Sequence, residues 1–176
     1  MKQVVLVGLM GSGKSTVGAL VAPRTGREFV DVDVVIAEET GKTVRELWEE
    51  GGETAYRQLE SDAVLRVLRG PTPSVLAAPG GVILNPLVRT ALADCRVVWL
   101  RADPATLAGR VRPGDHRPLL GDRPAETLAA QAKARSDLYQ EVATAVIDTD
   151  DLGPDAIADV VVGLLADGQA DAASTE

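Results

Sequence analysis

Gly8-Leu9-Met10-Gly11-Ser12-Gly13-Lys14-Ser15 is the stretch that decides the fold. It matches the pattern G-x-x-x-x-G-K-[ST] at every specified position. A short apolar run over 4–7 precedes it, and a helical pattern over about 14–24 follows it. This is the strand–loop–helix setting that the pattern needs, so the sequence predicts a buried strand, a phosphate-binding loop and a helix in that order.

The residue types of this loop suit a nucleoside triphosphate. Glycines let the backbone curl so that successive N–H groups face phosphate oxygens, and the N-terminus of the next helix adds the positive end of its dipole. We expect Lys14 to reach the β- and γ-phosphates and the Ser15 hydroxyl to ligate Mg²⁺. A glycine-rich turn without a ligand is the competing interpretation, which motif and context together disfavour. The motif does not indicate which molecule receives the phosphoryl group.

Short apolar runs alternate with helical patterns along the rest of the chain. Further strands are predicted at 29–31, 75–77, 96–100 and 145–147. Helices are predicted at 33–39, 44–50, 54–68, 86–93, 104–111, 125–143 and 154–165. This alternation is typical of an α/β fold with a mostly parallel sheet.

Composition narrows the class of protein. A length of 176 residues suits one domain, which we place at 1–166, with a disordered tail over 167–176. The net charge of −8 argues against general nucleic-acid binding. No stretch approaches the roughly 20 apolar residues that cross a bilayer, and the single cysteine cannot form an intrachain disulfide. We expect a cytoplasmic protein whose partner is a small molecule, with no nucleic acid and no membrane.

Carboxylates follow the second predicted strand. Asp31 and Asp33 alternate, so both side chains can face the phosphate-binding loop. One is suited to hold Mg²⁺ through water and the other to take a proton from an attacking hydroxyl. A helix N-cap is the competing interpretation for Asp33, because aspartate is favoured there.

Three arginines are candidates for the acceptor side. Arg57 stands three residues before Glu60 on a predicted helix, where a surface ion pair is the competing interpretation. Arg117 lies in the irregular segment 112–124, which is rich in Pro, Gly and Arg and is predicted to be a mobile lid. A lid arginine can stabilise charge during phosphoryl transfer, although many loop arginines are merely solvated. Arg135 lies on a later helix.

Taken together, these residues resemble the shikimate kinases in order and spacing, from residue 4 to about 165. The motifs that carry the resemblance are Gly11-Ser12-Gly13-Lys14-Ser15-Thr16, Asp31-Val32-Asp33 with Ile36 and Glu38, Tyr56-Arg57 with Glu60, Gly80-Gly81, Arg117-Pro118-Leu119-Leu120, and Arg135 with Leu138-Tyr139. Each of the later motifs alone is weak evidence for the family, but their joint order and spacing after the phosphate-binding loop are specific.

The resemblance implies a fold and an activity. The fold is that of nucleoside-monophosphate kinases, a three-layer α/β/α arrangement around a five-stranded parallel sheet in the order 2-3-1-4-5 with a mobile lid. The activity is transfer of a phosphoryl group from ATP, with Mg²⁺, to the 3-hydroxyl of shikimate by a monomer.

The resemblance also implies roles for individual residues. Nucleotide is held by Gly11, Ser12, Gly13, Lys14, Ser15, Thr16, Arg110 and Arg117, and Mg²⁺ by Ser15 and Asp31. The acceptor is held by Asp33, Arg57, Gly80, Gly81 and Arg135, with Glu60 orienting Arg57. Catalysis is implied for Asp33 as base, with Lys14 and Arg117. Trp48 and Tyr56 stand either around the acceptor or in the core.

Two departures from the family pattern bear on substrate. The family usually has three glycines where this chain has Pro79-Gly80-Gly81, and proline has no N–H to donate. The stretch 148–151 is acidic where many relatives have an arginine near adenine. A kinase for a nucleotide, a cyclitol or a sugar acid such as gluconate is therefore the alternative. A non-catalytic nucleotide-binding module is disfavoured because Lys14 and Asp33 are both present.

Overall fold

The computed structural model describes residues 2–111, 120–121 and 123–173, with side chains as far as 166. At its centre is a parallel sheet of five strands in the order β2-β3-β1-β4-β5. The strands are β1 (Val4–Val7), β2 (Glu28–Asp31), β3 (Ser74–Ala77), β4 (Arg96–Arg101) and β5 (Ala145–Asp148). The predicted sheet and its order are confirmed.

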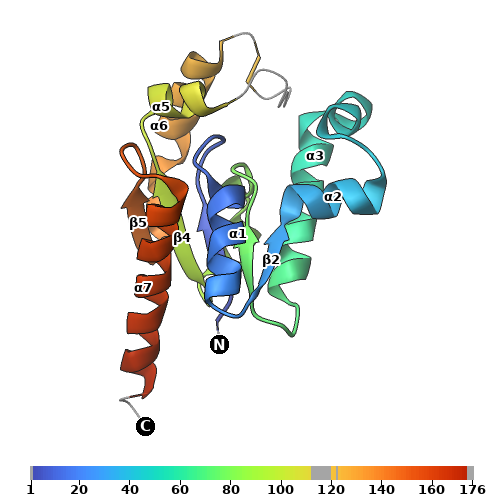
Figure 1. Cartoon of the computed structure of the whole chain (residues 1–176). Coiled ribbons are helices and arrows are strands. Elements are labelled where there is room, and N and C mark those ends of the chain that lie inside the picture. The colour runs from blue at the N-terminus through green and yellow to red at the C-terminus, as the bar shows by residue number, and fades with distance from the viewer. Residues whose placement is uncertain (1, 112–119, 122, 174–176) are drawn as a thin grey trace.

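Helices cover both faces of this sheet and complete a three-layer α/β/α fold (Figure 1). The helices are α1 (Lys14–Arg24), α2 (Val32–Thr40), α3 (Val44–Leu68), the 3₁₀ turn η1 (Val82–Leu84), α4 (Pro86–Leu92), α5 (Pro104–Arg110), α6 (Pro124–Val142) and α7 (Pro154–Ala173). On one face α1 and α7 pack side by side, and on the other α3, α4 and α6 contribute to the core.

The strands are apolar on both sides because both faces are covered. In β1, Val5 and Val7 point into the core shared with α3, α4 and α6, whereas Val4 and Leu6 point into the core shared with α1 and α7. All four side chains are buried. Burial of one such side chain contributes about 1.5–3 kcal/mol, so the run over 4–7 anchors the loop that follows it in the centre of the sheet.

One helix differs in length from the sequence prediction, and a predicted break is confirmed. The helices expected at 44–50 and 54–68 are the two arms of α3, which meet at Gly52, whose non-helical φ of 71° lies in the left-handed region that glycine tolerates. Helix α7 continues to Ala173, past the domain boundary predicted at 166. That boundary and the tail stay predictions, since the last residues, 174–176, lie outside the described part of the chain.

Most of the predicted lid, with Arg117, lies outside the described residues. Of its predicted range, Leu120 is buried and its carbonyl accepts a hydrogen bond of 3.0 Å from the Thr127 hydroxyl. Helix α6 begins at Pro124, where proline fits the first helical position. The lid itself stays a prediction.

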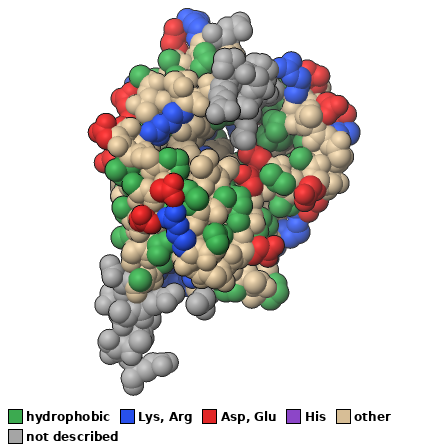
Figure 2. Space-filling view, in the orientation of Figure 1, with side chains coloured by type: hydrophobic (Ala, Val, Ile, Leu, Met, Phe, Trp, Pro, Cys, Tyr) green, Lys and Arg blue, Asp and Glu red, His purple; other side chains and the backbone are tan. Residues whose placement is uncertain are grey.

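The surface carries mixed charge on the side that Figure 2 shows, with acidic and basic side chains interspersed. None of the helices in the described part of the chain is long and apolar enough to cross a membrane.

Candidate active site

The phosphate-binding loop joins β1 to α1 and depends on its glycines. Gly8, Gly11 and Gly13 have φ of 146°, 81° and 90°, which side-chain-bearing residues rarely adopt. A Cβ on Gly8 would lie 2.5 Å from the Leu100 carbonyl oxygen, and one on Gly11 would lie 2.7 Å from that of Leu107. The loop is therefore packed between β4 and the end of α5, and its conformation follows from its sequence.

Lys14 lies across this loop. Its Nζ donates to the carbonyl oxygens of Gly8 and Leu9 at 2.9 Å each, and the Ser12 Oγ lies 3.4 Å away. Helix α1 begins at Lys14, directly after Gly13, which has no side chain to cap the first N–H groups. The loop thus gathers a cation and the positive end of a helix, the combination that suits phosphate.

A cavity of about 490 Å³ opens over the loop. Its lining includes loop and α1 residues, two carboxylates, one arginine and apolar side chains, namely residues 10–17, Asp31, Asp33, Ala77, Ala78, Arg110, Leu152, Pro154 and Ile157. The structure therefore brings together the predicted Gly11 to Thr16, Asp31, Asp33 and Arg110.

The two aspartates share the cavity but have different local roles. Asp31 ends β2 and is the N-cap of α2, since its Oδ1 accepts from the Asp33 backbone N–H at 3.0 Å. The cap therefore belongs to Asp31, where the sequence analysis had weighed it for Asp33. Asp33 stands in the first turn of α2, where the helix dipole favours a negative charge. Both residues line the cavity over the phosphate-binding loop.

The wall of the cavity beyond the loop is apolar, and sequence reasoning missed it. Leu152 just before α7 and Pro154 and Ile157 in its first turn form this wall, and Arg110 lines the cavity beside them. The Arg110 guanidinium donates to the Thr149 hydroxyl at 3.0 Å and to the Thr149 carbonyl oxygen at 2.5 Å. A planar group could lie between this arginine and the apolar wall. The available signal was an apolar residue and a proline directly after the acidic run.

Two carboxylates of the acidic run are hydrogen-bonded to neighbouring groups. Asp148 pairs with Arg101 at 2.5 and 2.8 Å, and this hydrogen bonding lowers the pKa of Asp148. Asp150 accepts the Asp103 backbone N–H at 3.0 Å, and hydrogen bonds from Thr106 and Asp103 lower the pKa of Asp150. These two carboxylates therefore tie the loop after β5 to β4 and α5.

Arg57 is a residue of α3 whose side chain extends toward Gly81, beside the phosphate-binding loop. Its Nη1 donates to the Glu60 Oε2 at 2.6 Å, and Glu60 is only 1% exposed. The pair is therefore not the surface pair that was the competing interpretation. A Cβ on Gly81 would overlap the Arg57 guanidinium, so this guanidinium lies directly against the glycine. Trp48 lies beside it, 6.0 Å from the guanidinium carbon to the ring centre, and Tyr56 is buried against Trp48.

Arg135 reaches the same glycines from α6. It is 8% exposed, and its Nη1 donates to the Gly80 carbonyl oxygen at 3.3 Å. Burial lowers the pKa of Arg135, and the nearby Arg57 lowers this pKa further, while the Tyr139 side chain, which is hydrogen-bonded to Arg135, and Glu60 oppose the shift. Two guanidinium groups close together disfavour each other unless an anion joins them. The pair therefore suits a carboxylate, which a guanidinium can bind through two hydrogen bonds.

Gly80 joins this arginine pair to the phosphate-binding loop. A Cβ on Gly80 would lie 2.9 Å from the Gly8 carbonyl oxygen, so the two loops are in direct contact. Pro79 opens the turn, and its carbonyl oxygen accepts the Val82 N–H at 3.2 Å. The arrangement thus sets a phosphate cradle, two carboxylates and an anion clamp within one connected site, which is what transfer of phosphate to a carboxylated alcohol requires.

Comparison with known families and sequences gives a consistent result. The family model described as shikimate kinase matches residues 10–166. The chain is 40% identical over 157 residues to a shikimate kinase of Thermobifida fusca, covering 89% of this chain and 91% of that protein. It is 41% identical over 163 residues to a shikimate kinase of Streptomyces avermitilis, covering 93% of this chain and 95% of that protein.

Solved structures give the same fold. The shikimate kinase from Acinetobacter baumannii, in complex with shikimate, superposes with a TM-score of 0.91 at 32% identity and covers 96% of this chain and 94% of its own. A gluconokinase from Sinorhizobium meliloti superposes with a TM-score of 0.71 at 22% identity, covering 99% of this chain and 97% of its own, a likeness that shows the fold alone.

Proposed function

The chain belongs to the shikimate kinase family, and from this premise we propose that it transfers the γ-phosphoryl group of ATP to the 3-hydroxyl of shikimate. The products are shikimate 3-phosphate and ADP. The observation that carries the proposal is the meeting of Arg57 and Arg135 at Gly80-Gly81, in contact with the phosphate-binding loop. Shikimate has the carboxylate that such a pair binds and the hydroxyls that a carboxylate base can orient.

The transfer is a direct displacement. The acceptor oxygen bonds to the γ-phosphorus as the bond to the β-phosphate oxygen breaks, and the hydroxyl proton passes to Asp33. Lys14 exchanges the carbonyls of Gly8 and Leu9 for phosphate oxygens and stabilises the charge on them. Arg117 is proposed to add a second positive charge from the lid, although it lies outside the described residues.

Mg²⁺ is proposed to bind between Ser15 and Asp31, with Asp31 acting through water. Both residues line the same cavity, and Mg²⁺ commonly uses one or two protein oxygens together with substrate phosphates. When bound, the ion neutralises charge on the phosphates. The hydrogen bond from the Asp33 backbone N–H, which makes Asp31 the N-cap of α2, fixes the Asp31 carboxylate in this position.

The clamp on the acceptor predicts a selective defect. We expect Arg57→Ala to raise the KM for shikimate by about 10- to 150-fold, because a charged hydrogen bond to a carboxylate contributes about 1.5–3 kcal/mol. The KM for ATP should stay within about two-fold, since only the acceptor has the matching carboxylate. Steady-state kinetics with each substrate varied in turn measures both.

Arg66→Ala is the matched control for Arg57→Ala. Arg66 lies on the same helix and pairs with Glu39 on the surface, so its removal should leave both KM values unchanged. A similar rise in the KM for ATP and for shikimate in Arg57→Ala would show that Arg57 does not hold the acceptor.

A sugar acid or cyclitol is the second candidate acceptor, because Pro79 replaces an N–H donor beside Gly80. We expect kcat/KM for shikimate to exceed that for gluconate or nucleoside monophosphates by at least about a hundred-fold, the order of selectivity that polar recognition supports. A panel of these acceptors, with ADP formation as the readout, gives the comparison. Faster turnover of gluconate would replace shikimate as the substrate.

We also propose that the enzyme is a monomer in the cytoplasm. Support for the monomer is that one chain supplies the loop, both aspartates and both arginines of the site. Support for the compartment is the need for ATP and the single cysteine, which is buried.

A further inference from the structure

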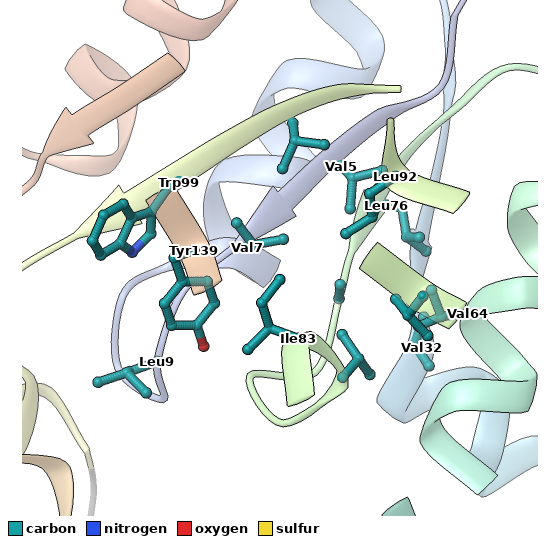
Figure 3. Close-up of a cluster of buried hydrophobic side chains, with 14 of the residues drawn as sticks. Val5, Val7, Leu9, Val32, Val64, Leu76, Ile83, Leu92, Trp99 and Tyr139 are labelled. Atoms are coloured by element: carbon teal, nitrogen blue, oxygen red, sulfur yellow. The ribbon is translucent and has the colours of Figure 1, made fainter. Parts of the chain in front are cut away.

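Tyr139 is a buried residue of α6 that the proposed mechanism does not use. It is 1% exposed, and its ring stacks on Trp99 of β4 with centres 5.3 Å apart. In Figure 3 it lies beside Trp99, with Leu9 of the phosphate-binding loop and Ile83 of η1 nearby. Its hydroxyl donates to the Gly80 carbonyl oxygen at 2.7 Å. The residue therefore connects the sheet to the Gly80-Gly81 loop, against which Arg57 and Arg135 lie.

The Gly80 carbonyl oxygen receives a second donor, the Arg135 Nη1 at 3.3 Å. Arg135 precedes Tyr139 by one helical turn, so both side chains extend from the same face of α6. The tyrosine bond is the shorter of the two, and it is well within the normal range for an O–H donor. The hydroxyl is the principal partner of this carbonyl, and the guanidinium contributes a longer bond.

We propose that Tyr139 is a positioning residue for the acceptor: its hydroxyl donates to the Gly80 carbonyl oxygen and is itself hydrogen-bonded to the Arg135 guanidinium, so that it fixes both the glycine turn and the arginine that binds the acceptor carboxylate. This inference rests on the proposed function, because it assigns a task within the same site. Without the hydroxyl, the part-buried Gly80 carbonyl keeps only its longer bond from Arg135, and the guanidinium loses its contact with Tyr139. The loss of a hydrogen-bond partner is costly away from water, so the guanidinium is then held less firmly in the position that suits the acceptor carboxylate.

Two observations support the hydroxyl as the active part of Tyr139. Burial raises the pKa of this hydroxyl, so it is a protonated donor at neutral pH. Gly80 is also confined on its other side, since a Cβ there would meet the Gly8 carbonyl oxygen at 2.9 Å. The peptide group of Gly80 is therefore fixed between Tyr139 and the phosphate-binding loop, and a small shift moves it relative to both substrates.

Tyr139→Phe tests the proposal, because phenylalanine keeps the ring on Trp99 and removes only the donor. We expect the KM for shikimate to rise by about five- to ten-fold, the effect of one lost hydrogen bond on substrate binding, while the KM for ATP changes by less than about two-fold. Amide hydrogen exchange in the segment 80–84 should quicken. A purely structural role would lower the amount of active enzyme and leave both KM values as they are.

Ser136→Ala is the matched control, because it removes from the same helix a hydroxyl that donates to the Ala132 carbonyl oxygen at 2.7 Å and not to Gly80. It should leave both KM values and the exchange of 80–84 unchanged. The double variant Tyr139→Phe with Arg135→Lys should show less than the product of the two separate effects on the KM for shikimate, since the residues share one carbonyl.

The remaining outcomes distinguish failure of the Tyr139 proposal from failure of the proposed function. An unchanged KM for shikimate in Tyr139→Phe overturns the positioning role, as does failure of this variant to fold, because the hydroxyl would then serve the structure. If the wild-type enzyme does not phosphorylate shikimate, the proposed function fails. The KM values of the wild type and Tyr139→Phe are then compared for the acceptor of the panel that the enzyme does phosphorylate. Equal KM values for that acceptor in the two proteins would again overturn the role of Tyr139.

Discussion

Lys14→Met is expected to reduce the rate of phosphoryl transfer by at least about a thousand-fold, the effect of removing a preorganised charge that stabilises the transition state. Methionine keeps the unbranched stem and loses the ammonium group. The bonds of Nζ to Gly8 and Leu9 show that this group already lies over the loop where phosphates are proposed to bind. Coupled measurement of ADP formation at saturating shikimate gives the rate.

The variant should remain folded, because losing these hydrogen bonds costs about 1–2 kcal/mol of a total stability of about 5–15 kcal/mol. Thermal unfolding followed by circular dichroism checks this. Lys42→Met is the control, since Lys42 pairs with Glu50 on the surface and its loss should leave the rate unchanged. A Lys14→Met enzyme that is folded and retains a tenth of the activity or more would remove Lys14 from the chemistry.

Asp33→Asn should lower kcat by about 100- to 10,000-fold, the range for loss of a positioned general base. Asparagine has the same shape, and it can still fit the first turn of α2, so the fold should survive with a loss of about 0.3–1 kcal/mol of favourable helix-dipole energy. The affinity for ATP should change little, because the phosphate-binding loop and Lys14 are intact.

The measurement for Asp33→Asn pairs single-turnover kinetics with titration of a non-hydrolysable ATP analogue by calorimetry. Glu39→Gln provides the control, because it removes a charge from the same helix at the exposed pair with Arg66. Turnover like that of the wild type would show that Asp33 does not accept the proton. A large loss of nucleotide affinity would instead assign Asp33 to the metal and phosphate side of the site.

Sequence alone was sufficient where local chemistry decides the structure. The phosphate-binding loop was predictable because Gly8, Gly11 and Gly13 need backbone conformations that few other residues adopt. The strand at 4–7 was predictable because a run of apolar β-branched residues must be buried on both faces. The order of the strands came from the resemblance, since periodicity does not state which strand pairs with which.

Sequence was insufficient where distant segments meet. Nothing local to Arg57 or Arg135 shows that both reach Gly80-Gly81, because that meeting depends on how α3 and α6 pack against the sheet. The apolar wall at Leu152 and Pro154 was missed because the sequence analysis considered only the acidic residues that precede it. The break at Gly52, by contrast, was predictable from the sequence, since glycine pairs usually end helices.

The contact between Gly80 and the Gly8 carbonyl has a consequence for redesign of the enzyme. Any side chain at position 80 would push the Gly80-Gly81 loop away from the phosphate-binding loop. The distance between the acceptor hydroxyl and the γ-phosphorus would then increase. Room for a bulkier alcohol therefore has to be made at the far wall, at Trp48, where exchange of the side chain leaves that spacing and Arg57 unchanged. A library that varies this wall and leaves both glycines intact would change which alcohol is accepted without slowing the transfer itself.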